Sequence, residues 1–149
     1  MNAHAELAAA LDEPVKLTGL LIDIERPSHH EGAIADAVEA VLRGLDGVSV
    51  ERTGDGGNTL VARTDRGLGQ RVVLAGHLDT VPLADNTPHR LADGVLHGCG
   101  AVDMKSGLAV YLSAFARLAG HPDLARDMTF IAYEGEEVAV AYNVLGHDE

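Results

Sequence analysis

At the centre of the chain stands the stretch Gly98-Cys99-Gly100-Ala101-Val102-Asp103-Met104-Lys105-Ser106-Gly107, on which the arrangement of the whole domain depends. It places one carboxylate, Asp103, in a glycine-flanked loop directly before the apolar run 108–119. Two further polar clusters, Gly76–Pro82 and Glu134–Glu137, each follow a short apolar run. Because α/β sheets place their sites beyond the ends of core strands, the three clusters predict one common site.

Helical and extended patterns alternate along the chain, which predicts an α/β domain with helices flanking a mixed, largely parallel sheet. Apolar residues at helical spacing predict helices over 5–25 (a pair broken near Pro14), 28–45, 108–118 and 138–145. Alternating or continuous apolar runs predict strands over 48–52, 58–63, 72–75 and 128–133, and a hairpin over 88–97 with an Asp-Gly turn. Since the run 72–75 does not alternate, we expect this strand to be covered on both faces.

Two stretches at the ends of predicted elements carry specific local patterns. Ser28 is followed three residues later by Glu31, the spacing of a capping box. This pattern places His29 and His30 in the exposed first turn of the second helix. The glycine-rich cluster 53–57 is interpreted as a turn between strands, because no helix follows it and no Lys-Ser/Thr pair closes a phosphate-binding loop.

The composition indicates one acidic globular domain. The 149 residues include 11 Lys and Arg against 23 Asp and Glu, a net charge of −12 that argues against a nucleic-acid partner. A hydrophobic share of 46% is sufficient for a core, and the single cysteine, Cys99, excludes an internal disulfide. We find neither a signal-peptide pattern nor an apolar run of the about 20 residues that span a bilayer. We therefore expect a cytoplasmic protein with no membrane partner.

The polar clusters contain the donor atoms of a metal-dependent hydrolase. His77 and Asp79 lie two residues apart, so at the end of a strand both point to one side, where Asp79 can accept the ring N–H of His77. Asp103, with two oxygens in a glycine-softened loop, can bridge two metal ions. Glu136 and Glu137 are adjacent, so one can bind metal while the other faces water. A pair of metal ions with a carboxylate base is a hydrolytic site.

Other interpretations of these residues stay open at this point. An acidic residue in a loop is usually a solvated turn or cap residue. Cys99 suggests a thiolate nucleophile, although a small buried thiol fits better because no helix N-terminus or basic partner is evident. Lys105 and Ser106 suggest a nucleophile pair, but they are better placed to open the following helix. Three histidines without a carboxylate at useful spacing are interpreted as surface or turn residues: His89, His97 and His121.

The polar clusters, in this order, resemble the N-terminal signatures of the M20 metallopeptidase family of zinc peptidases and amidohydrolases. The matching motifs are Gly76–Pro82, Gly98–Gly107 and Tyr133–Glu137. Within the family they are most similar to the desuccinylase branch, whose members act in lysine biosynthesis. The resemblance extends from the first predicted helix to the last residue, and three motifs in one order are highly specific.

The resemblance implies a role for each candidate residue. His77 is a ligand of one zinc ion, Asp103 bridges two zinc ions, and Glu137 binds the second; cobalt is a possible substitute. Asp79 supports His77, and Glu136 is the general base that acts on a metal-activated water. Such a base has a pKa raised toward neutrality.

The chain also departs from the family pattern. Family members continue with a further carboxylate ligand, a lid domain that also dimerises, and a late histidine ligand. We therefore expect residues 1–149 to be the N-terminal portion of the catalytic domain, with the lid and the C-terminal part absent. The terminal cluster 147–149 matches no family motif. The resemblance further implies a cis peptide bond between Asp103 and Met104.

The expected function is zinc-dependent hydrolysis of the amide bond of a small N-acyl amino acid, here an N-succinyl one, impaired in the free chain. The alternative is a non-catalytic truncated fragment, or a split half that needs a C-terminal partner. Within the family the alternatives are a peptidase, an acetylornithine deacetylase or an aminoacylase. If the sheet normally packs against a missing half, an apolar edge is exposed and the chain self-associates through it.

Overall fold

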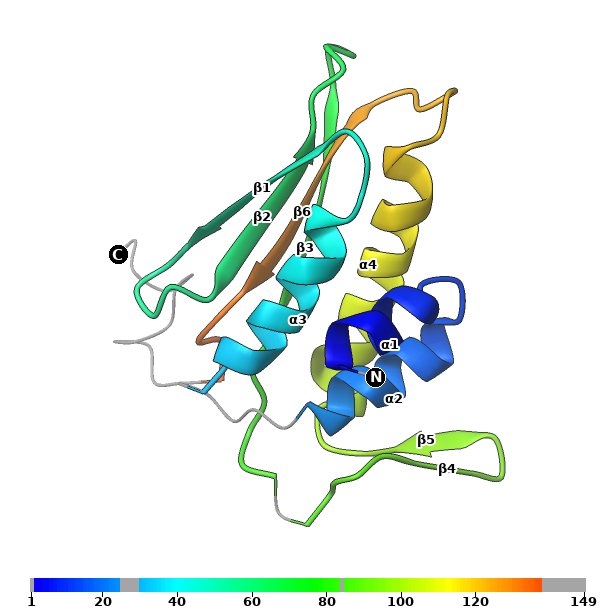
Figure 1. Cartoon of the computed structure of the whole chain (residues 1–149). Helices are drawn as coiled ribbons and strands as arrows, with labels where there is room; N and C mark the ends of the chain where they lie inside the picture. Colours follow the sequence, from blue (N-terminus) through cyan, green and yellow to red (C-terminus); the bar gives the residue numbers. More distant parts are fainter. Residues whose placement is uncertain (1, 25–29, 84, 138–149) are drawn as a thin grey trace.

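The computed structural model describes residues 2–24, 30–83 and 85–137, which form a four-stranded sheet, a separate two-stranded hairpin and a layer of helices (Figure 1). The elements, in chain order, are α1 (Ala3–Ala9), α2 (Pro14–Asp23), α3 (Gly32–Arg43), β1 (Val48–Thr53), β2 (Thr59–Thr64), β3 (Arg71–His77), β4 (Arg90–Ala92), β5 (Val95–His97), the π-helical turn η1 (Ala101–Lys105), α4 (Ser106–Ala119) and β6 (Asp127–Tyr133). The predicted α/β class and mixed sheet are confirmed.

The sheet has the strand order β1-β2-β6-β3. β2 pairs antiparallel with both β1 and β6, whereas β3 pairs parallel with β6, so the parallel part lies at one side of the described sheet. The expectation that the 72–75 strand is covered on both faces is wrong for the described residues. Val72 and Val73 are consecutive residues whose side chains point to opposite faces, and they are 40% and 55% exposed, so neither face is fully covered at this end of β3, the edge strand of the described sheet.

The core lies between the sheet and the helices. α3 packs on β1 and β2, α4 packs on β3 and β6, and α2 packs on α4 (Figure 1). The ring of Phe115 in α4 meets that of Phe130 in β6 at 5.8 Å between centroids. Two apolar residues of α4, Val110 and Leu118, are 50% and 43% exposed and do not belong to this core. No described helix is long and apolar enough to cross a membrane.

The helix starts agree only in part with the sequence patterns. Pro14 does separate two helices, and it stands at the first position of α2, where a missing N–H costs nothing. α3 begins at Gly32, later than the predicted start, with Glu31 at its N-cap position, and the predicted capping box falls on Ser28, outside the described residues. His30 is exposed as expected, but it precedes the helix. Ser28, His29 and the predicted helix 138–145 lie outside the described residues.

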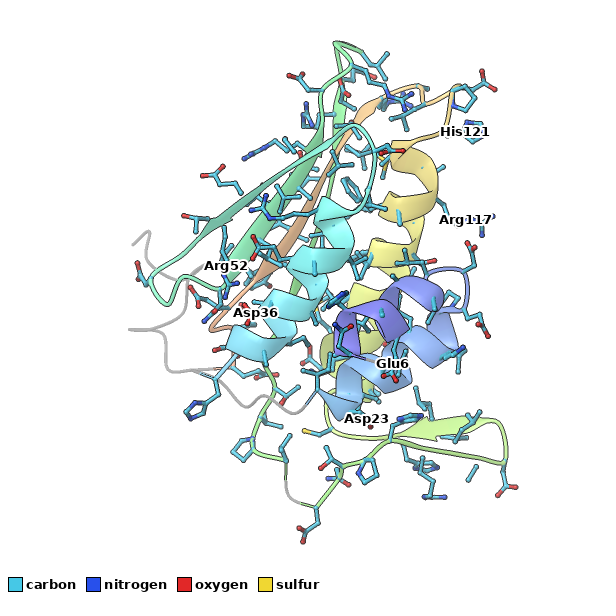
Figure 2. All side chains as sticks on the ribbon, in the orientation of Figure 1. Glu6, Asp23, Asp36, Arg52, Arg117 and His121 are labelled. Carbon is cyan, nitrogen blue, oxygen red and sulfur yellow. The ribbon has the colours of Figure 1, made fainter. Side chains whose placement is uncertain are left out.

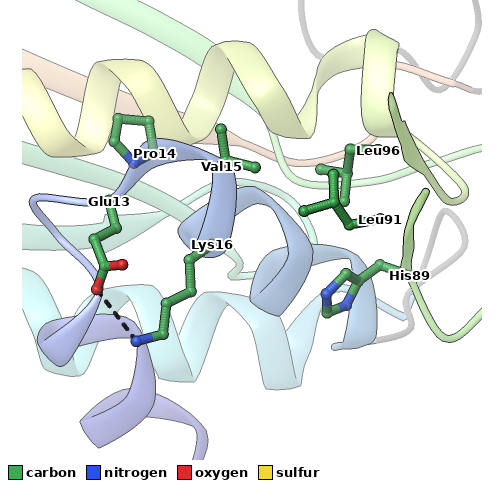
Figure 3. Close-up of a pocket in the computed structure, with 7 residues that line it drawn as sticks. All are labelled: Glu13, Pro14, Val15, Lys16, His89, Leu91 and Leu96. Carbon is green, nitrogen blue, oxygen red and sulfur yellow. Dashed lines mark hydrogen bonds and ion pairs between the residues drawn. The ribbon is translucent and has the colours of Figure 1, made fainter. Parts of the chain in front are cut away.

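The β4–β5 hairpin turns at Asp93 and Gly94, whose positive φ values of 51° and 76° match the predicted Asp-Gly turn. His89 is a partly exposed loop residue, which agrees with its interpretation as a surface or turn residue, but it has a carboxylate partner far away in the sequence. Its main-chain N–H and its Nδ1 lie 2.7 and 2.8 Å from the two oxygens of Asp23 at the end of α2. A cavity of about 500 Å³ opens beside this contact, between the start of α2 and the hairpin (Figure 3).

Candidate metal centre

The parallel pairing of β3 and β6 sets the position of the candidate site. In this register His77, the last residue of β3, stands opposite Tyr133, the last residue of β6. The main-chain N–H of Leu78 donates to the Tyr133 carbonyl at 2.8 Å, which closes the ladder. Both strands therefore end on the same rung, and the two polar clusters that follow them emerge side by side.

Asp79 holds these two clusters together. Its fully buried carboxylate accepts the main-chain N–H of Glu136 at 3.1 Å and that of Glu137 at 2.8 Å. Gly135, at φ 73°, allows the tight turn that presents these two N–H groups. The third cluster reaches the same place through η1, where the Asp103 side chain is 74% exposed and the Asp103–Met104 peptide is cis, as expected.

The structure brings three of the predicted residues within reach of one cation. Each of His77, Asp103 and Glu137 offers a ligand atom, and these atoms all lie within 4.8 Å of one another. His77 Nε2 is 3.0 Å from Asp103 Oδ1. Glu137 and Asp103 also line one open groove of about 620 Å³. The two carboxylates are therefore accessible from this groove.

The orientation of the His77 ring is set by its other nitrogen. Nδ1 lies 3.0 Å from the main-chain carbonyl of Asp79 and 3.4 Å from its carboxylate. The expected acceptor was the carboxylate, but the closer one is the backbone oxygen, since the carboxylate already accepts two main-chain N–H groups. This contact holds the ring in the orientation that points Nε2 toward Asp103.

The charges around His77 favour a cation at this position. Burial alone would lower the pKa of the His77 ring, but the hydrogen bonds with Asp79 and Asp103 outweigh it and raise that pKa to about 9. One imidazole nitrogen with two carboxylates is a donor set that zinc accepts. The residues present therefore fit the predicted type of ion.

Tyr133 is a site residue that the sequence interpretation missed. Burial, together with the charge of Glu136 and a hydrogen bond to it, raises the pKa of the Tyr133 hydroxyl to about 12. Its ring centroid lies 6.1 Å from that of His77. Tyr133 thus connects the last residue of β3 with Glu136. The strand pairing that brings them together is not visible in the local sequence.

The structure shows what surrounds the residues considered as alternative nucleophiles, Cys99, Lys105 and Ser106. Cys99 is buried, and its thiol donates to the Val81 carbonyl at 3.5 Å, which agrees with a small buried thiol. Ser106 begins α4 as expected. Lys105 is buried to 1% exposure, and its Nζ donates to the Leu21 carbonyl near the C-terminus of α2 at 3.0 Å. The nucleophile-pair interpretation therefore gives way to a structural role for Lys105.

Comparisons with known proteins identify a family and several relatives of this chain. Residues 73–147 match the model of the peptidase family M20/M25/M40. The chain is 54% identical to a succinyl-diaminopimelate desuccinylase of Corynebacterium glutamicum over 97% of its length. It is 48% identical over 90% of its length to a putative succinyl-diaminopimelate desuccinylase of Mycobacterium tuberculosis. The chain spans 40% and 36% of the lengths of these two relatives.

Solved structures share the fold at low sequence identity. Human carnosine dipeptidase 1 superposes with a TM-score of 0.66 at 23% identity, over 95% of this chain and 36% of the dipeptidase chain. Aminopeptidase PepT from Bacillus cereus superposes with a TM-score of 0.71 at 21% identity, over 88% of this chain and 38% of the aminopeptidase. At these identities the likeness concerns the fold alone.

Proposed function

Because this chain belongs to the peptidase family M20/M25/M40, we propose that it carries metal-binding and catalytic residues of a zinc-dependent amide hydrolase of the succinyl-diaminopimelate desuccinylase type. One observation carries the proposal: ligand atoms of His77, Asp103 and Glu137, from three separate chain segments, lie within 4.8 Å of one another. The 54% identity to a desuccinylase supports the choice of this type over the peptidases, whose likeness is limited to the fold.

In this proposal His77 would hold one zinc ion and Glu137 a second, Asp103 would be a ligand of both, and cobalt is a possible substitute. Bound zinc supplies a Lewis acid that polarises the amide carbonyl and activates water. Asp79 keeps the His77 ring in the orientation that points Nε2 toward the site. It also fixes the main chain at Glu136 and Glu137.

Glu136 is proposed as the general base. Its carboxylate accepts a proton from the attacking water and returns it to the leaving amine, and the products are succinate and a free amino group. The hydrogen bond with Tyr133 orients the Glu136 carboxylate for this step.

The substrate in this proposal is a small N-succinyl amino acid. The groove beside Asp103 and Glu137 is lined by apolar side chains such as Val81, Pro82 and Val102, and by Asn86 and His97. Among its described lining residues no Lys or Arg occurs. The succinyl carboxylate would therefore find its cationic partner elsewhere, so the described groove supports the amide-hydrolase class more strongly than the particular acyl group.

A second candidate is cation binding with little turnover. Catalytic zinc ions typically have three protein ligands each, whereas two ions would share three such residues in the described part of the chain. We therefore propose that the 149-residue chain binds a cation but hydrolyses slowly unless another polypeptide supplies further ligands.

Zinc titration by calorimetry, together with hydrolysis of N-succinyl-diaminopimelate, tests the proposal. We expect zinc binding that His77→Ala, Asp103→Ala and Glu137→Ala each weaken about 100-fold or more. The matched control is His121→Ala, which removes an exposed imidazole whose described side-chain contact is local to its turn and should leave zinc affinity unchanged. Zinc binding that ignores all three substitutions would refute the assigned ligands. Binding without turnover selects the second candidate.

A further inference from the structure

Glu134 is a buried carboxylate of the polar cluster Glu134–Glu137 that the proposed reaction does not use. It is 6% exposed and lies directly after β6, two residues before Glu136. Its carboxylate oxygens accept the main-chain N–H groups of Gly56 at 2.9 Å and Asn58 at 3.2 Å. Its own N–H donates to the Thr59 hydroxyl at 3.4 Å. Glu134 therefore fastens the end of β6 to the turn between β1 and β2.

The glycines of this turn are shaped to the Glu134 carboxylate. A Cβ atom placed on Gly54 would overlap Glu134 Oε1, and one placed on Gly56 would overlap Oε2. At Gly56 the backbone φ is not positive, so a side chain there would meet the Glu134 carboxylate, and not backbone strain, and would have to displace that carboxylate. The glycine-rich cluster 53–57 thus forms a receptor for a carboxylate of its own chain.

Arg52 contacts the same turn, 53–57, from the side opposite Glu134. The Arg52 guanidinium donates to the Gly57 carbonyl at 2.6 Å and to the Asn58 side chain at 2.8 Å. It also pairs with Asp36 and Glu39 of α3 at 2.6 and 2.9 Å (Figure 2). A continuous set of charge-assisted hydrogen bonds therefore runs from α3 through the turn to Glu134.

We infer that Glu134 is a positioning residue for the candidate metal centre: it anchors one end of loop 134–137 to the hairpin turn, while Asp79 anchors the other end. Because both ends of loop 134–137 are held, the main-chain positions of Glu136 and Glu137 are restrained, and so are the directions of their side chains. Groups that orient metal ligands typically change affinity by about 10–100-fold when removed. The inference rests on the proposed function only in taking Glu137 as a metal ligand.

The first measurement needs no metal. Amide hydrogen exchange of the full metal-free chain is followed by NMR in the wild type and in Glu134→Ala. We expect the amides of Gly56 and Asn58 to lose their acceptor, and those of Glu136 and Glu137 to exchange about 10-fold faster. Exchange at Glu136 and Glu137 that stays at the wild-type rate in a folded Glu134→Ala variant would overturn the inference.

The second measurement is titration with Co²⁺ alone, followed by its visible absorption. Glu134→Ala should weaken Co²⁺ binding about 10-fold and alter the spectrum, and Glu134→Gln, which keeps one oxygen acceptor, should be intermediate. Gly56→Ala should do the same by displacing the carboxylate without touching its charge. The matched control is Asp55→Asn, an equal charge change at an exposed residue of the same turn, which should leave binding unchanged.

The double variant Glu134→Ala/Gly56→Ala makes the test independent of general destabilisation. If the two residues act through one contact, the double variant binds Co²⁺ no more weakly than Glu134→Ala alone. Additive losses would overturn the inference, because Gly56 would then act by another route. A wild-type chain that binds no Co²⁺ would refute the proposed function, while the exchange measurement still decides whether Glu134 orders loop 134–137.

Discussion

The carboxylate of Asp79 accepts the main-chain N–H of Glu137 at 2.8 Å, although 58 positions separate them in the sequence. With the second bond from Glu136, this buried acceptor connects the end of β3 to the loop that follows β6. We predict that Asp79→Asn, which turns one acceptor oxygen into a donor, leaves one main-chain N–H unsatisfied. The variant should lose about 1–3 kcal/mol of stability and bind zinc about 10–100-fold more weakly.

Denaturant unfolding and zinc calorimetry measure the two effects of Asp79→Asn. Asp93→Asn is the matched control, since it makes the same chemical change at an exposed left-handed position that suits Asn. Zinc affinity equal to that of the wild type in Asp79→Asn would contradict the anchoring role.

A second prediction concerns the only two lysines of the chain, Lys16 and Lys105. Lys105→Met should destabilise the protein by about 1–3 kcal/mol, because the Leu21 carbonyl loses a buried donor near the helix end. Lys16→Met removes an exposed pair with Glu13 and should cost less than about 1 kcal/mol. Urea unfolding of both variants measures the difference, and equal costs would show that the Lys105 contact adds nothing.

Asp127 gives a prediction about acid stability. Hydrogen bonds from the main-chain N–H groups of Leu68 and Arg66 hold the pKa of this carboxyl at about 2, below its ordinary value of 3.8. A lowered folded-state pKa contributes stability above the ordinary value and loses it as the pH falls through the folded value. Asp127→Asn should therefore be less stable than the wild type at pH 6, and the gap should close between about pH 4 and pH 2.

Thermal unfolding across this range, with Asp123→Asn as the exposed control, checks the Asp127 prediction. A gap between wild type and Asp127→Asn that stays constant down to pH 2 would contradict it.

The fourth prediction concerns the contact between Gly19 of α2 and His89, which precedes the hairpin. The effect of Gly19→Ala on stability should depend on whether the His89 ring is present. Alanine inside a helix usually stabilises by about 1 kcal/mol relative to glycine. At Gly19, however, a Cβ atom would lie 2.6 Å from Nε2 of His89. Gly19→Ala should therefore gain nothing in the wild type, because it displaces the ring that pairs with Asp23.

In the His89→Ala background the ring is gone, and the same Gly19→Ala change should yield the full gain. Denaturant unfolding of the four proteins in this cycle measures the difference. An equal gain in both backgrounds would show that the ring yields its place at no cost.

Most elements were predictable because their signals are local, and the convergence of the three clusters followed from the general rule that α/β sheets place their sites beyond the ends of core strands. The Asp-Gly turn, Pro14 as a helix start and the apolar strands depend on neighbouring residues. The strand order, the Asp23–His89 pair and the burial of Lys105 were not, since each depends on segments far apart in the chain. The glycine cluster 53–57 was correctly interpreted as a turn, yet its partner Glu134 is visible only after folding.

Among the described strands one pair is parallel, β3 with β6, and the register of this pair determines whether the candidate metal centre can form. Side chains alternate along a strand, so a slip of one position would move His77 away from its rung opposite Tyr133 and reverse the facing of one strand's side chains. His77 and Glu137 could then no longer bind the same metal centre. Cation affinity therefore depends on the correct register of β3 and β6. Molecules with a shifted register would keep the circular dichroism of the native fold but would give weak visible absorption on addition of Co²⁺.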